Sequence, residues 1–335
     1  MLSPRRHHLL APLLVTLVMA LNGCKSSPSP TTTPPSTRAT STTHPQDAAL
    51  DVLLDELWAL NMKTFPRWAT YEGLRDYDAE LTDISPEATE RYLSQLEAIA
   101  SRAEELSPEQ LSPMARDTRR MLLLQAKQQR AEQVCESEKW SVDGLGGPQV
   151  SFPMMPVFHV IRSQQDVDTL NARYQKTARY MEQHIANLRA GLAKGLIAPR
   201  INVERAITQL DKFIALPVDD SHPMLTLKIE SDDVKVDDSA LSKSLTQVVI
   251  PALTTYRDML RQEILPAARE EVGLANLPNG TACYTVSIAG YIGEGFSPDE
   301  LHQRGLDELA KMEAGMVEVG EELGVEVGCG GEGGR

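Results

Sequence analysis

Basic side chains are too few in this sequence to suit a nucleic-acid-binding protein. The 335 residues include 33 lysines and arginines against 47 aspartates and glutamates, and the formal net charge at pH 7 is −14. Phosphate backbones and anionic lipid headgroups repel such a chain. We therefore exclude nucleic acid as a partner and expect no electrostatic docking of the protein's body on a membrane.

Aromatic residues are also scarce, at 5% of the chain. Strands favour aromatic and β-branched residues, whereas Ala and Leu, which are abundant here, favour helices. No alternation of strands and helices typical of a parallel sheet is present. The composition therefore predicts an all-α, multi-helix domain.

Cysteine is rare, with one residue at each of positions 24, 135, 283 and 329. No Cys or His lies at zinc-ligand spacing from Cys135 or Cys283, which argues against a structural zinc site. In an oxidising compartment these two residues could form a disulfide. Two buried free thiols are the alternative, because the sequence does not show whether their Cα atoms approach each other.

Complete catalytic signatures are absent. The sequence contains no His-Glu-x-x-His and no Gly-x-Ser-x-Gly motif. The glycine cluster at residues 143–148 lacks the lysine of a phosphate-binding loop, so we interpret it as a turn. The acidic residues within 230–238 lack the spacing of a calcium loop and predict a solvated loop.

Histidines are few and scattered. No two of them lie four residues apart, the spacing that would let them share a helix face for a metal. His184 lies between apolar positions, which indicates a residue at a helix surface or boundary. His302 follows Glu300 in the first turn of the last predicted helix, where a polar contact is the simplest role. The histidines beyond the N-terminal segment are at positions 44, 159, 184, 222 and 302.

The N-terminus has the pattern of a secretory signal. Arg5 and Arg6 precede a mainly apolar stretch over residues 9–21, which is too short to span a bilayer comfortably. The sequence Leu-Asn-Gly-Cys at residues 21–24 then resembles the lipobox of bacterial lipoproteins. It predicts a signal peptide over residues 1–23 and lipidation of Cys24; an ordinary signal followed by a chance cysteine is the alternative.

Residues 24–46 form a candidate tether. This stretch is rich in Ser, Thr and Pro and has no large apolar residue, so it cannot bury enough surface to fold. An extended spacer suits a body held off a membrane by a lipid anchor. The residue after Cys24 is Lys25 rather than an aspartate, a pattern that resembles the sorting signal for the outer membrane. We expect a lipid-anchored protein of the cell envelope, with its body in the periplasm or at the cell surface.

The body from residue 47 to residue 323 has helical periodicity. Ser85 and Ser107, each followed by Pro, predict two helix starts, the second supported by Gln110 at the capping-box position. Pro251 and Pro266 predict kinks or breaks in a long helix. Residues 152–156 and 217–238 are expected to be irregular. Apolar stripes predict helices over residues 50–58, 93–100, 114–134, 167–192, 203–214 and 240–269.

Two further predictions concern the C-terminal part of the sequence. Residues 281–292 fit a strand and a short helix equally well. Ser297 and Glu300 form a capping-box pattern that opens a final helix. Its apolar residues, three and four apart, form a seam that needs a partner helix: Leu309, Met312, Met316, Val319 and Leu323.

From about residue 51 onward, the sequence resembles the N-terminal half of a bacterial family called domain of unknown function 885. The likeness rests on four stretches: residues 143–149 (DGLGGPQ), 180–197 (YMEQHIANLRAGLAKGLI), 277–284 (LPNGTACY) and 296–306 (FSPDELHQRGL). Members of this family resemble helical zinc metallopeptidases of the gluzincin type. Their metal motif, a His-Glu-x-x-Pro-Gly-His-His run, lies in the C-terminal half.

The resemblance implies an incomplete half of a larger helical fold. It transfers no catalytic or metal-binding residue to this chain, and zinc is expected only in full-length relatives. It does imply a substrate-facing role for the segment around Glu300 and His302. Residues 324–335, half of them glycine, are either a flexible tail or an aberrant end, and the resemblance favours the second.

Two function classes follow. The first is an envelope metallopeptidase represented by its non-catalytic half, which faces a peptide substrate but is inactive as written. The second is a non-enzymatic helical lipoprotein that binds a peptide or another envelope protein. Chelator-sensitive hydrolysis would indicate the first class, and binding without turnover the second.

Overall fold

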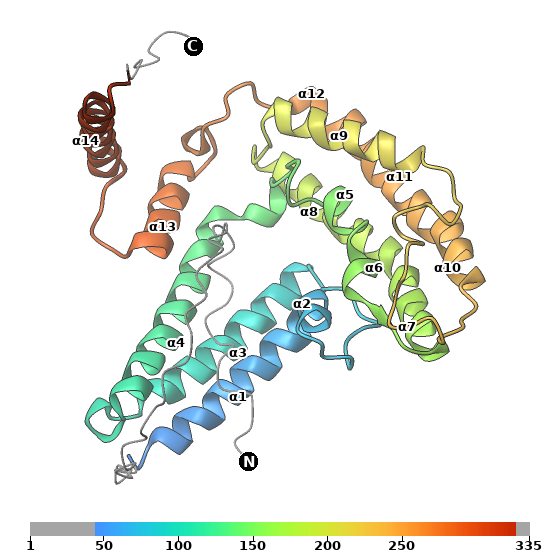
Figure 1. Ribbon diagram of the computed structural model, residues 1–335, viewed down its shortest axis with the longest axis horizontal. Coiled ribbons are helices and arrows are strands. Elements are labelled where there is room, and N and C mark those ends of the chain that lie inside the picture. Colours follow the sequence, from blue (N-terminus) through green and yellow to red (C-terminus); the bar gives the residue numbers. More distant parts are fainter. Residues whose placement is uncertain (1–43, 326–335) are drawn as a thin grey trace. The chain divides into compact units, whose positions relative to one another are not determined.

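The computed structural model describes residues 44–325, and its regular structure is almost entirely helical (Figure 1). The predicted all-α fold is thereby confirmed. The strands β1 (Val160–Ile161) and β2 (Lys228–Ile229) have two residues each and pair in parallel. The predicted signal peptide, Cys24, most of the tether and nearly all of the glycine-rich tail lie outside the described residues. Within 44–325, no helix is long and apolar enough to cross a bilayer.

Three of the first helices pack together into one small core. They are α1 (Asp47–Thr64), α3 (Pro86–Glu104) and α4 (Pro113–Ala131), with the short α2 (Pro66–Tyr71) following α1. Their apolar stripes meet because residues three and four apart share one helix face. The buried side chains of this first core include Leu53, Leu57, Leu93, Leu96 and Leu122.

Helix α4 begins within one residue of the start predicted at residue 114, but the helix start predicted at Ser107 is not that of an α-helix. Residues Pro108–Gln110 form only a single 3-10 turn, and the helix begins after Ser112, whose Oγ accepts a hydrogen bond from the Ala115 N–H at 3.3 Å. Ser112 precedes Pro113, which disfavours helical backbone at Ser112 and so ends any helix that starts at Ser107. At Ser85 the predicted cap is confirmed, with Ala88 as the donor.

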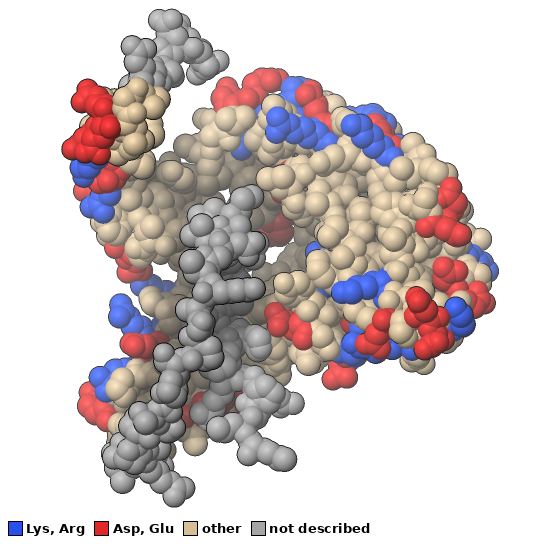
Figure 2. Space-filling view, viewed as in Figure 1, with Lys and Arg blue, Asp and Glu red and all other residues tan. Residues whose placement is uncertain are grey.

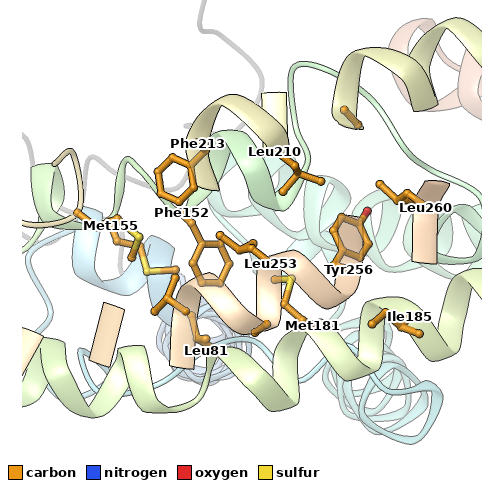
Figure 3. Packing of buried hydrophobic residues seen from close by; sticks show 14 of the residues in the cluster. Leu81, Phe152, Met155, Met181, Ile185, Leu210, Phe213, Leu253, Tyr256 and Leu260 are labelled. Carbon is orange, nitrogen blue, oxygen red and sulfur yellow. The ribbon is translucent and has the colours of Figure 1, made fainter. Parts of the chain in front are cut away.

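A second, larger core forms between the helices of the middle of the chain. These are α7 (Gln164–Gln175), α8 (Thr177–Ala193), α9 (Arg200–Ile214), α10 (Ser239–Ser244) and α11 (Ile250–Met259). In Figure 3 the side chains of Phe152, Met181 and Leu253 point toward one another. The single helix predicted over 167–192 is two helices that meet at Lys176.

The long helix predicted over 240–269 is helical throughout most of its length and ends directly after Pro266. Two π-helical turns, Leu245–Val249 and Leu260–Ile264, precede Pro251 and Pro266 respectively. A proline removes one N–H donor and crowds the preceding turn, and a π turn widens the backbone at that point. The chain therefore continues through α11 and into α12 (Leu265–Ala267).

One single helical turn precedes the stretch 152–156, which was predicted to be irregular, and a second overlaps it. They are α5 (Pro148–Ser151) and α6 (Met155–Phe158), each with a proline in its first turn. Proline is compatible with that position because its missing N–H would have no partner there. The prediction of irregular backbone over residues 152–156 was therefore wrong at α6.

Residues 281–292, which fitted a strand and a helix equally well, belong to helix α13 (Gly280–Ile292). Only Gly280 and Cys283 of this helix are buried. A Cβ atom at Gly280 would lie 2.0 Å from the Leu274 carbonyl oxygen, so the close approach of the two backbones requires glycine. Cys283 and Cys135 are joined in a disulfide, with their Cα atoms 4.7 Å apart.

The final helix, α14 (Pro298–Leu323), starts at the predicted capping box. The Ser297 Oγ accepts a hydrogen bond from the Glu300 N–H, and the Glu300 carboxylate accepts one from the Ser297 N–H. Gly320 is the one buried residue of this helix. The apolar seam predicted from the sequence is exposed, at 51–71% of each side chain's surface.

The disulfide generates a testable prediction. The two cysteines close a loop of 148 residues, which in the chain-entropy description stabilises the folded state by about 4–5 kcal/mol. We expect Cys135→Ser/Cys283→Ser to lower the free energy of unfolding by up to this amount in urea titrations. Thiol labelling of unreduced, denatured mature protein provides the direct check, and two reactive thiols at these positions would contradict the pairing.

Candidate functional site

The two residues predicted to face a substrate lie in the first turn of α14. The Glu300 carboxylate is occupied by the helix cap, because it accepts hydrogen bonds from both the N–H and the hydroxyl of Ser297. The bond from the Ser297 backbone holds the pKa of Glu300 below its usual range. His302 is exposed and lies two positions further on, a spacing at which side chains point in different directions. The structure therefore does not pair Glu300 with His302, and a role facing a substrate stays a prediction.

A group of buried charged residues that the sequence did not reveal lies between the two cores. Asp78, His159 and Arg173 each expose 1% or less of their surface. Arg173 on α7 donates to the Thr70 hydroxyl at 2.7 Å and to the Tyr77 carbonyl at 2.9 Å. Thr70, at the end of α2, donates to the Asp78 carboxylate at 2.5 Å. We call Asp78, His159, Arg173 and the hydroxyl of Thr70 the buried ion cluster.

Two less buried residues extend this cluster toward the surface. The Arg75 Nε lies 2.8 Å from the Asp78 Oδ2 without the alignment of a hydrogen bond, and another Arg75 nitrogen donates to the Asp166 Oδ1 at 2.7 Å. Asp166 also caps α7 together with Ser163. Although burial raises the pKa of Asp166, hydrogen bonds from Arg162 and Arg75 hold it below its usual value. The two arginines and two aspartates alternate, so their charges balance.

His159 is a neutral member of the cluster. Its Nε2 lies 2.9 Å from the Asp166 backbone carbonyl oxygen, so this nitrogen carries the proton and donates it. The Nδ1 is then unprotonated and lies 3.9 Å from the Asp78 Oδ2. Burial lowers the pKa of His159, and the charge of Arg173 acts in the same direction against that of Asp78.

Arg173 keeps its charge inside the protein. Burial lowers its pKa to about 10, which still leaves the guanidinium protonated at neutral pH. A buried cation without a partner is strongly unfavourable, and Asp78 and Thr70 supply the compensating interactions. These interactions join α2, the loop that follows it and α7.

The other internal histidines, His184 and His222, also contact residues of the fold itself. His184 was predicted at a helix surface or boundary, but it lies in the middle of α8 and packs inward, with its ring centroid 4.7 Å from that of Tyr180 and 5.9 Å from that of Tyr256. Burial lowers its pKa to about 4. The His222 Nδ1 accepts a hydrogen bond from the Met224 N–H at 3.2 Å. In the part of the chain that the structure describes, no three His, Cys, Asp or Glu side chains are grouped to hold a metal ion.

The glycine cluster at residues 143–148 is a turn, as predicted. The Asp143 Oδ1 accepts hydrogen bonds from the N–H groups of Leu145 and Gly146 at 2.7 and 2.6 Å. Gln209 on α9 donates to the Gly144 carbonyl oxygen at 2.9 Å. The N–H groups that a phosphate would need are thus directed at an aspartate of the same turn.

A groove lies between the end of α3 and α4. Its volume is about 560 Å³, and it is lined by the apolar side chains of Leu123 and Leu124 together with charged residues. Four of the charged lining residues are basic and two are acidic: Arg116, Arg119, Arg120 and Lys127, and Glu104 and Asp117. This α4 groove combines apolar surface with an excess of positive charge.

One isosteric substitution in the buried ion cluster is expected to lower the stability of the protein strongly. We expect Asp78→Asn to lower the free energy of unfolding by about 3–5 kcal/mol, because it leaves the charge of Arg173 buried without its counter-ion. Arg162→Gln breaks the exposed pair with Glu230 and is the matched control, with an expected loss below about 1 kcal/mol. Equal effects of the two substitutions in urea titrations would contradict this description of the cluster.

The buried histidines predict a loss of stability in acid. Burial lowers the pKa values of His159, His184 and His222, so the unfolded chain takes up protons that the folded chain does not. Stability is then complete above the unfolded value and falls as the pH drops from about 6.5 toward 4. His184→Phe keeps an aromatic ring but removes one titrating group. We expect its free energy of unfolding to fall less steeply over this interval than that of the unmodified protein, and parallel pH profiles would disprove the assignment.

Comparisons with known proteins agree with the fold. The model of a family described as bacterial protein of unknown function (DUF885) matches residues 66–331. A crystal structure from Colwellia psychrerythraea, named as a putative lipoprotein, matches with a TM-score of 0.72 and 19% identity. The match covers 84% of this chain and 52% of that chain, so this protein spans about half the length of its structural relative. No protein of curated function matches. Because the family model matches well over half of the sequence, the chain belongs to the family of bacterial proteins called domain of unknown function 885.

Proposed function

We propose that this protein is a lipid-anchored lipoprotein of the bacterial cell envelope, held to the outer membrane through Cys24. The carrying observation is the order of basic residues, apolar stretch, Leu-Asn-Gly-Cys and Ser/Thr/Pro-rich spacer ahead of a folded helical body. The name of the structural relative, a lipoprotein, supports the same location. In this proposal the tether lets the body stand off the bilayer.

Within this family, the body resembles the non-catalytic half of a zinc metallopeptidase. The arrangement of its charged residues supports a scaffold, because Asp78, Arg173 and Asp166 are engaged with one another inside the protein. A catalytic zinc needs three protein ligands and an open position for water. We propose that this chain neither holds zinc tightly nor hydrolyses peptides.

Binding of a peptide or envelope protein without turnover is the second candidate function. The α4 groove favours it, because apolar side chains beside Arg116 and Arg120 suit an acidic, partly apolar segment. Hydrolysis and binding are separable experimentally, since only the first consumes the peptide.

Lipid anchoring is tested by Cys24→Ala. Without the thiol no acyl chain can be attached, and we expect either unprocessed precursor or release of a soluble body. Membrane fractionation and the mass of the N-terminal peptide are the measurements. Lys25→Ala, which keeps the cysteine, is the control and should remain in the membrane fraction. Normal processing and membrane retention of the Cys24→Ala protein would place the anchor elsewhere.

The scaffold interpretation is tested on purified mature protein. We expect no stoichiometric zinc by elemental analysis after dialysis and no peptide hydrolysis that a chelator abolishes. Binding of acidic peptides that weakens in Arg120→Ala, with the peptide recovered intact, would favour the second candidate function. One equivalent of tightly held zinc together with turnover would refute the scaffold interpretation.

A further inference from the structure

Helix α14 carries a continuous apolar face that the described part of the chain leaves uncovered. We call this face the α14 stripe. Each side chain of the stripe exposes 47–71% of its surface, and Gly320 is the one buried residue of the helix. The stripe consists of Leu306, Leu309, Met312, Met316, Val319 and Leu323.

The spacing of the stripe is that of a helix-packing seam. From Leu309 to Leu323 the apolar residues alternate in steps of three and four, which keeps them in one line along the helix. An apolar surface of this length is uncommon on a protein that works alone, and such surfaces mark sites of interaction. The stripe therefore indicates a partner helix that lies along α14.

The charges beside the stripe define the chemistry of that partner. Helix α14 has eight acidic and two basic side chains. Glu308, Glu313 and Glu322 occupy the positions that flank the seam, while Lys311 is paired with Glu308 on the same helix. Figure 2 shows acidic side chains along α14 next to its uncharged surface.

These acidic flanks disfavour two obvious occupants. Two copies of α14 packed on each other would bring glutamates of both helices together at the flanking positions, where like charges repel. An anionic bilayer surface would repel the same residues, since helices that lie on such membranes have basic flanks. A helix with basic flanks would gain favourable interactions at each of these positions.

We propose that the α14 stripe is the docking surface for an amphipathic helix whose apolar residues are bordered by lysine and arginine. This inference rests on the proposed function, in which the body is a non-catalytic scaffold. The partner helix covers Leu309, Met316 and Leu323 and pairs with the glutamates beside them.

Three synthetic helices test the proposal on the soluble mature protein. All share one apolar stripe; the first carries lysine and arginine at its flanks, the second glutamate, and the third has the first one's composition in scrambled order. By fluorescence anisotropy we expect the basic helix to bind with one-to-one stoichiometry and about tenfold or more tighter than the acidic one. Added salt should reduce this preference, because it screens exposed charges.

Variants of the protein locate the site. Leu309→Glu/Met316→Glu places charge in the centre of the stripe and should abolish binding of the basic helix. Val272→Glu, at an apolar residue that is 70% exposed outside α14, is the matched control and should bind normally. Both residues of the double variant are exposed on a helix surface, so circular dichroism should show that the fold is retained.

Several outcomes would overturn the proposal. Equal binding of the basic and acidic helices, or unchanged binding by the double variant, would remove its basis. Concentration-dependent dimerisation that Leu309→Glu/Met316→Glu abolishes would identify a second copy as the occupant, and stripe-dependent partitioning onto anionic vesicles would identify the membrane. Zinc content and peptide hydrolysis are measured separately, so failure of the scaffold proposal is distinguishable from failure of this one.

Discussion

A buried carboxylate, that of Asp78, constrains several segments of the chain at once. Removing Asp78 and Arg173 from water is unfavourable unless each finds its partners. Thr70, Arg173 and Arg75 must therefore converge on Asp78, although Arg173 lies 103 residues from Thr70. As a result, the loop after α2 has a defined path between the first core and α7 despite its lack of regular structure.

The disulfide is a second constraint, and it acts where packing contributes little. Helix α13 buries only Gly280 and Cys283, so the bond to Cys135 compensates for a small apolar contact area. Two polar contacts with α4 add to it: Gln128 donates to the Val286 carbonyl oxygen, and Lys127 pairs with Glu294.

The distribution of charged and apolar side chains explains the functional interpretation. Polar groups with lowered pKa values, such as Arg173 and His159, form hydrogen bonds inside the fold. Large apolar residues, in contrast, are exposed along α14. This contrast is the observation behind the scaffold proposal.

By itself, the sequence determined the features that depend on neighbouring residues. The helical class, the caps at Ser85 and Ser297, the turn at Asp143 and the apolar face of α14 follow from spacing and local hydrogen bonds, which act within a few residues. The sequence also allowed the Cys135–Cys283 pairing without deciding it.

Only the tertiary structure decided the features in which distant or competing interactions take part. Residues 281–292 are a helix, and the chain passes Pro251 and Pro266 through π turns, because packing selects among backbones that the local pattern permits. The buried ion cluster was not predictable, since Asp78 and Arg173 have no shared periodicity and meet only when α2 and α7 come together. A charge pattern in sequence does not say which charges lose contact with water; the folding of distant segments does.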